Sequence, residues 1–214
     1  MYTLYYSPGS CSLIIHCLLA ELGAPFELKR VDFEKKEHHG AQFRKLNPKG
    51  KVPALATPDG VLTECMALTE YLCNRHDAEG RWLAKPGSWR RAKTLENIAT
   101  LSTEIHNNLF NRFFHEDAFS ADPKVQAEVK EVAAGRLGEF FRGEEAALTR
   151  PYWSGGDAPD AADLYFMVIV RWGRWLAPPA TRMGKLEPFF ARMSERPAVA
   201  QSFQREGIPP FGNT

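Results

Sequence analysis

Strand patterns in this chain stop at Thr63, and every later pattern is helical. Short aromatic or alternating apolar runs are typical of β-strands, and they occur at 2–6, 26–31, 51–56 and 61–63. Between and after these runs the apolar residues recur at helical spacing, up to His76. The expected order is βαβ, then a short helix, then ββα. This order predicts a small α/β domain of about 80 residues, within the usual size of a domain.

The remainder of the chain predicts an all-helical domain. Ser88 can cap a long helix that continues towards Phe114, and Pro123 can begin a second one. Asp160 can cap the most apolar helix, whose apolar residues face nearly all round, as in a helix at the centre of a domain. Residues 77–87 break all periodicity. We therefore expect an N-terminal domain, a linker and a helical domain at 1–77, 78–87 and 88–214.

Composition narrows the possible functions. Hydrophobic and charged contents of 44% and 25% are typical of a soluble globular protein. The net charge is +1 and the basic residues are scattered, so we expect no nucleic-acid partner. The longest apolar run, 164–170, is far shorter than the roughly 20 residues that span a bilayer, and no basic segment precedes the first apolar stretch. We expect a soluble, cytoplasmic protein without a membrane partner.

The cysteines indicate a reducing compartment. They have neither CxxC spacing nor an accompanying histidine cluster, and the chain is too large to need a disulfide framework. Free thiols and the absence of a metal site are the simplest expectation for the set Cys11, Cys17, Cys65 and Cys73.

Cys11 is the first candidate for chemistry. It follows the strand 2–6 and a Ser-Pro-Gly loop, at or beside the first turn of a helix. Unpaired backbone N–H groups and the positive end of the helix dipole favour a thiolate there. The alternative is a buried structural cysteine, as most free cysteines are. Ser10 and Tyr6 are nearby rivals for the same role.

Several motifs coincide with one family. They are the segments 5–13, 47–55 and 62–64, followed by Leu83-Ala, Glu104-Ile-His106, Ala162-Asp163 and Arg196-Pro-Ala-Val. In order and spacing they resemble the cytosolic glutathione transferases, most closely the bacterial beta class, which has cysteine where other classes use tyrosine or serine. The resemblance covers essentially the whole chain. It implies a thioredoxin-like domain followed by a helical domain with a hydrophobic acceptor pocket, paired as a homodimer.

The resemblance also implies a glutathione site on the first domain. Cys11 would lie at the glutathione sulfur. Val52, before a cis-Pro53, would pair its backbone with the cysteinyl part of the tripeptide. Glu64 and Cys65, at a helix N-terminus, would hold the γ-glutamyl end, since the helix suits a carboxylate and Glu64 suits an ammonium.

Further residues complete the implied site. Lys35, with Lys36 as the alternative, would face the glycyl carboxylate. His106, on the first long helix, would project beside the glutathione sulfur as a catalytic residue with Cys11, and Glu104 would contribute to glutathione binding. Taken alone, Lys35 is an ordinary loop lysine and His106 is more often a simply hydrogen-bonded histidine. Glu64 alone would complement the helix dipole.

The chain departs from the family pattern at four positions. Cys65 stands where serine or glycine is common, Ala99 replaces an asparagine, and Asn107 replaces a lysine after the histidine. Asp160 replaces the usual serine or threonine cap. The first three changes are expected to alter glutathione affinity and substrate range, and the last is a sound substitute.

Three functions remain open at this stage. The first is a detoxifying glutathione S-transferase, which stabilises the glutathione thiolate for attack on hydrophobic electrophiles. The second is thiol-disulfide exchange or reductive dehalogenation through Cys11, which a cysteine at this position permits. The third is a non-catalytic glutathione-binding scaffold, because a fold does not fix a function.

Overall fold

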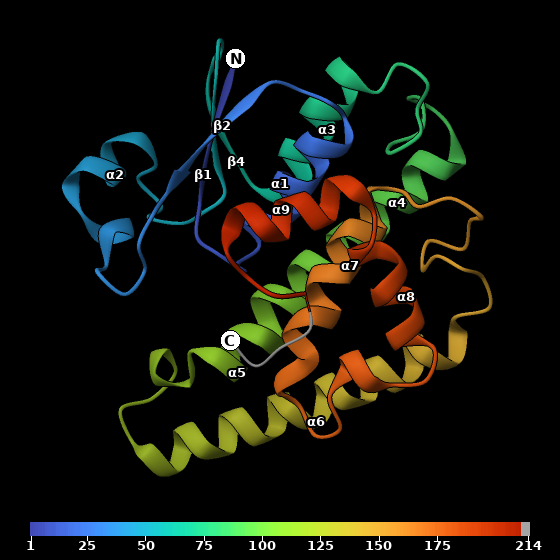
Figure 1. Ribbon diagram of the computed structural model, residues 1–214. Helices are drawn as coiled ribbons and strands as arrows, with labels where there is room; N and C mark the ends of the chain where they lie inside the picture. Colours follow the sequence, from blue (N-terminus) through green and yellow to red (C-terminus); the bar gives the residue numbers. More distant parts are fainter. Residues whose placement is uncertain (211–214) are drawn as a thin grey trace. The chain divides into compact units, whose positions relative to one another are not determined.

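The computed structural model describes residues 1–210 (Figure 1). The chain forms two compact units, which are described separately below. The first comprises Met1–Ala92 and the segment that begins at Glu195, and the second comprises Lys93–Ser194. None of the helices within residues 1–210 is long and apolar enough to cross a membrane.

A mixed four-stranded sheet lies at the centre of the first unit, in the order β2-β1-β3-β4. Its strands are β1 Tyr2–Tyr6, β2 Phe26–Arg30, β3 Ala54–Thr57 and β4 Gly60–Thr63. β1 runs parallel to β2 and antiparallel to β3, so that the buried Leu4 lies opposite Leu28 and Leu55. β3 begins at Ala54 and not at the expected residue 51, because Pro53 has no N–H to donate to the ladder.

Helices cover both faces of this sheet. They are α1 Ser12–Glu21, α2 Ala41–Leu46 and α3 Cys65–His76. Alternate residues of β1 point to opposite faces. Tyr2 contacts Tyr71 of α3, and Tyr6 contacts His16 of α1, whereas Tyr5 contacts Phe43 of α2. Accordingly α2 lies across the sheet from α1 and α3 (Figure 1). The thioredoxin-like βαβαββα order expected from the sequence is confirmed.

The last helix of the chain, α9 Pro197–Glu206, also belongs to the first unit, where it packs along α1. Polar side-chain pairs connect this segment to α1. Glu206 Oε1 lies 2.9 Å from His16 Nδ1, and both side chains are fully buried. Arg196 donates two hydrogen bonds to Glu21, at 2.6 and 2.8 Å. The domain division expected from the sequence, at 78–87, groups α9 with the helical domain. In the structure, α9 belongs to the first unit.

The second unit is all-helical. α4 Trp89–Thr100 continues through a π-helical segment, Leu101–Phe110, into α5 Asn111–Phe114. The sequence predicts this helix but not its π-helical segment. The further helices are α6 Pro123–Ala147, α7 Ala161–Trp172 and α8 Leu186–Ser194. Short 3-10 turns occur at Glu37–His39 in the first unit and at Glu116–Ala118, Gly173–Trp175 and Ala180–Arg182 in the second.

α7 is the core of the second unit, since every one of its 12 residues is buried. It begins with a capping box. The N–H of Ala162 donates to Asp160, and the N–H of Asp160 donates to the Asp163 side chain, each at 2.8 Å. Asp160 is therefore the N-cap that the sequence predicts. Thr94 of α4 also donates its hydroxyl proton to Asp160, at 2.8 Å.

Candidate functional site

Cys11 is the N-cap residue of α1, as the sequence predicts. Its thiol donates a hydrogen bond to the carbonyl oxygen of Val52, at 3.3 Å. The side chain is partly exposed, whereas Cys17, Cys65 and Cys73 are buried. Cys11 is thus the cysteine that solvent and a small substrate can reach.

Cys65 begins α3 and lies directly beside Cys11. Its sulfur is 3.8 Å from the Cys11 carbonyl oxygen, and only 7% of the residue is exposed. The hydrogen bond to the Cys11 side chain and, after it, burial raise the pKa of the Cys65 thiol well above its usual range. The N-terminal ends of two helices, α1 and α3, therefore meet at a pair of thiols.

Glu64, the N-cap residue of α3, completes this edge of the first unit. Its backbone has φ 71° and ψ 122°, in the left-handed region that favours glycine. The largely exposed carboxylate accepts a hydrogen bond from Lys49 Nζ at 2.7 Å, and Lys49 also donates to the hydroxyl of Thr63 at 3.0 Å. The structure brings together four residues that the resemblance assigns to one site. Cys11 contacts both Val52 and Cys65, and Glu64 directly precedes Cys65.

Two further residues, Lys49 and Glu206, contribute to this edge without having been predicted from the sequence. Lys49 lies in the matched segment 47–55, so its position was the available signal. Glu206 gave no local signal, because it reaches the site from the far end of the chain. Its Oε2 accepts a hydrogen bond from the backbone N–H of Gly9 at 2.8 Å, while its Oε1 faces His16. Glu206 therefore fixes the loop that leads into Cys11.

The remaining predicted contacts of the first unit have local partners. The Val52–Pro53 peptide bond is cis, as expected. The Lys35 N–H donates to Asp32 at 3.1 Å, and its ammonium lies 3.8 Å from the same carboxylate. Lys36 is the left-handed residue that precedes the next turn. The assignment of Lys35 to the glycyl carboxylate stays a prediction.

His106 and Glu104 belong to the second unit, on its π-helical segment. His106 Nδ1 is 2.9 Å from the hydroxyl of Tyr165, and its ring packs edge-on against Trp172 with 4.8 Å between centroids. Glu104 accepts a hydrogen bond from Asn108 at 3.4 Å. π-Helical turns occur frequently at functional sites. The expected role of both residues towards glutathione stays a prediction.

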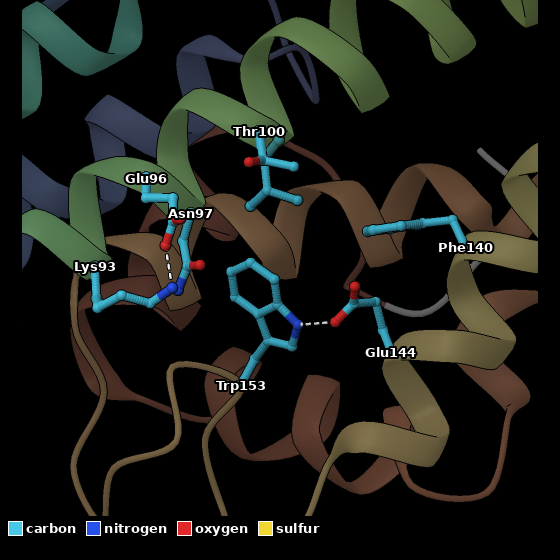
Figure 2. Close-up of a pocket in the computed structure, with 8 residues that line it drawn as sticks. Lys93, Glu96, Asn97, Thr100, Phe140, Glu144 and Trp153 are labelled. Carbon is cyan, nitrogen blue, oxygen red and sulfur yellow. Dashed lines mark hydrogen bonds and ion pairs between the residues drawn. The ribbon is translucent and has the colours of Figure 1, made fainter.

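The second unit also contains a pocket of about 330 Å³ between α4, α6 and the loop that carries Trp153 (Figure 2). The Trp153 indole N–H donates to Glu144 at 2.5 Å, and Lys93 pairs with Glu96 (Figure 2). These four polar side chains thus pair with one another, and none of the residues expected to bind glutathione lines the pocket. Among residues 1–210, no group of three or more histidine, cysteine or acidic side chains could hold a metal ion.

Comparisons with known proteins agree with this geometry. Residues 1–74 match the family described as "Glutathione S-transferase, N-terminal domain". The chain is 33% identical over 207 residues to the glutathione S-transferase GstA of Escherichia coli O157:H7, covering 96% of this chain and 98% of that protein.

Solved structures give the same picture. A glutathione-S-transferase from Xylella fastidiosa is 30% identical, with a TM-score of 0.86 and coverage of 98% of this chain and 100% of that one. A sphingomonad glutathione S-transferase complexed with glutathione is 29% identical, with a TM-score of 0.78 over 97% of this chain and 100% of that one.

Proposed function

Because the chain belongs to the glutathione S-transferase family, we propose that it binds glutathione against Cys11, Val52 and Glu64. There it stabilises the glutathione thiolate for attack on a hydrophobic electrophile. The observation that carries this proposal is the meeting of two helix N-termini, α1 and α3, at Cys11 and Cys65. The bound glutathione of the sphingomonad relative supports it.

Each part of glutathione has a partner of matching chemistry in this proposal. The γ-glutamyl carboxylate binds at the N-terminus of α3, where backbone N–H groups favour an anion. Its ammonium takes Glu64, which pairs with Lys49 in the free protein. The cysteinyl backbone pairs with Val52 beside cis-Pro53, and Lys35 faces the glycyl carboxylate.

The thiolate is the reactive species. The glutathione sulfur lies at the N-cap of α1, where the helix dipole and the Cys11 thiol stabilise negative charge. Lowering the pKa of the bound thiol by one unit corresponds to about 1.4 kcal/mol. The resemblance also supports roles for His106 and Glu104 towards glutathione and a hydrophobic acceptor pocket supplied by the helical unit.

Retention on immobilised glutathione tests this function. The protein should bind and be eluted by free glutathione, and it should conjugate glutathione to a chromogenic aryl halide. Glu64→Ala should lose retention, whereas Cys73→Ser, a change at a buried cysteine of the same helix, should not. Folded protein that neither binds nor conjugates would contradict the proposal, and binding without conjugation would favour the scaffold.

Thiol exchange through Cys11 is a second candidate function, favoured by the partial exposure of this cysteine. Cys11→Ser should abolish disulfide reduction but leave part of the conjugation activity, since a hydroxyl can still hydrogen-bond a thiolate. His106→Ala should slow both reactions more modestly, because its proposed role is to polarise. Disulfide reduction that survives Cys11→Ser would rule out this mechanism.

We also propose that the chain is a cytoplasmic homodimer that removes toxic electrophiles. Exposed apolar side chains support the pairing. Trp89 at the start of α4, Val132 on α6 and Met66 on α3 are 80%, 57% and 42% exposed. The free cysteines support a reducing compartment.

A further inference from the structure

We infer that Cys65 is a second redox residue of this site, which closes a disulfide with Cys11 after Cys11 has reacted with a glutathione disulfide. The inference rests on the proposed reactivity of Cys11 and deepens it. It assigns a chemical role to the buried cysteine at the start of α3.

The geometry brings the two thiols together from distant parts of the chain. The Cys65 thiol donates a hydrogen bond to the carbonyl oxygen of Cys11 at 3.8 Å, so the two residues are in direct contact. Cys11 is partly exposed and Cys65 is buried directly behind it. An incoming disulfide therefore meets Cys11 first, and Cys65 is placed to attack the Cys11 sulfur from inside the protein.

The electrostatics suit this order of events. The raised pKa of the Cys65 thiol has the hydrogen bond to the Cys11 side chain as its first cause, burial as its second and the charge of Cys11 as its third. When the Cys11 sulfur is joined to a glutathione sulfur, it can no longer carry negative charge. Loss of that charge removes one of the causes that raise the pKa of Cys65, so the thiolate fraction of Cys65 rises once there is a mixed disulfide to attack.

Two exchange steps balance the reaction. In the first, the Cys11 thiolate attacks one sulfur of glutathione disulfide; a Cys11–glutathione bond forms, and one glutathione leaves as a thiolate and takes up a proton. In the second, Cys65 loses its proton to solvent and attacks the Cys11 sulfur; the mixed disulfide breaks, and the second glutathione leaves. The protein dithiol is oxidised by two electrons, and one glutathione disulfide is reduced to two glutathione molecules.

Intact-mass measurement after incubation with glutathione disulfide and an acid quench tests the inference. The wild-type protein should lose two hydrogen atoms and keep no glutathione adduct, and peptide mapping should find Cys11 joined to Cys65. Cys65→Ser should instead accumulate one glutathione on Cys11. Cys73→Ser, the control at a buried cysteine on the same helix, should behave as the wild type does.

Two outcomes would overturn the inference, and they are distinguishable. A stable Cys11–glutathione adduct on the wild type, in the same amount as on Cys65→Ser, would remove the role of Cys65 and leave the reactivity of Cys11 intact. Neither adduct nor disulfide in any variant would overturn the reactivity of Cys11, and the inference with it. Peptide mapping of the wild type keeps the test valid if Cys65→Ser folds poorly.

Discussion

Glu64 carries a full side chain at φ 71°, where glycine is favoured. Such a conformation costs a residue with a side chain on the order of 1–3 kcal/mol. A glycine at this position would avoid that strain, but it would lose roughly 0.5–1 kcal/mol through its greater chain entropy in the unfolded state. We expect Glu64→Gly to unfold with a free energy about 1 kcal/mol higher than that of Glu64→Ala, which keeps the strain. Urea unfolding of both variants measures this difference.

The same pair of variants separates strain from binding. Both lack the carboxylate proposed for the glutathione ammonium, so both should lose retention on immobilised glutathione. Equal unfolding free energies for the two variants would show that the backbone of Glu64 relaxes without cost. Binding of the Glu64→Gly variant to immobilised glutathione would contradict the proposed contact between Glu64 and the glutathione ammonium.

Asp163 has a carboxyl group with an unusually high pKa. Burial, and then the negative charge of Asp160, raise its pKa from 3.8 to about 6. The folded protein thus binds this proton more tightly than the unfolded chain does. The resulting stability is fully present below about pH 4 and is lost as the pH rises through about 6, by roughly 3 kcal/mol in total.

Asp160→Asn removes the neighbouring charge and keeps an oxygen for the helix cap. We expect the pKa of Asp163 to fall, so that the loss of stability between about pH 4 and 6 becomes smaller. NMR titration of the Asp163 carboxyl carbon and urea unfolding across this range measure both effects. Asp157→Asn, at an exposed loop position, is the control. An unchanged pKa in Asp160→Asn would contradict the assigned cause.

At the scale of elements, α9 makes the most consequential contact. Glu206→Ala leaves His16 and the Gly9 N–H without their buried acceptor. Leaving a buried hydrogen-bond donor unsatisfied costs roughly 1–3 kcal/mol, and we expect a loss of unfolding free energy of at least this size. Alkylation of Cys11 should also change in rate, because Gly9 lies in its loop.

The control for this prediction is Glu187→Ala on α8, whose carboxylate pairs with Arg182 at the surface and should contribute at most about 1 kcal/mol. Glu206→Gln keeps one acceptor and should fall between the alanine variant and the wild type. If Glu206→Ala unfolds like Glu187→Ala, then α9 does not support the Cys11 loop.

Local patterns predicted most elements because apolar spacing depends on near neighbours. Residue spacing located β1 at its observed bounds and the end of α3 at His76. The π-helical segment was not predicted, since its spacing differs little from that of an α-helix over a few turns. The membership of α9 was missed because its partners lie 190 residues away.

The candidate site could be predicted only through the resemblance. Spacing alone pointed to Cys11, through its place at the start of a helix. Nothing local joins Val52, Glu64 and Cys65 to it, because the sheet and α3 bring them together. The pairing of Lys49 with Glu64 depends on side-chain direction, which periodicity does not describe.

For the whole molecule, light scattering tests the proposed homodimer. Exposed apolar residues such as Trp89 and Val132 should be covered by pairing, and a two-fold pair is the commonest assembly. We expect a mass of twice 24.1 kDa at micromolar concentration. Val132→Lys, which places a charge on α6, should shift the mass towards the monomer if this face is the interface. A monomeric wild type would remove the proposal.

The position of α9 has a consequence for synthesis on the ribosome. His16 is translated early, but its partner Glu206 comes 190 residues later. At about 5–20 residues per second, roughly 10 to 40 s separate the two. During that interval the nascent first unit exposes the surface of α1 that α9 later covers. We expect a nascent chain arrested before Pro197 to be cleaved by protease within this unit, and a chain released at full length to resist.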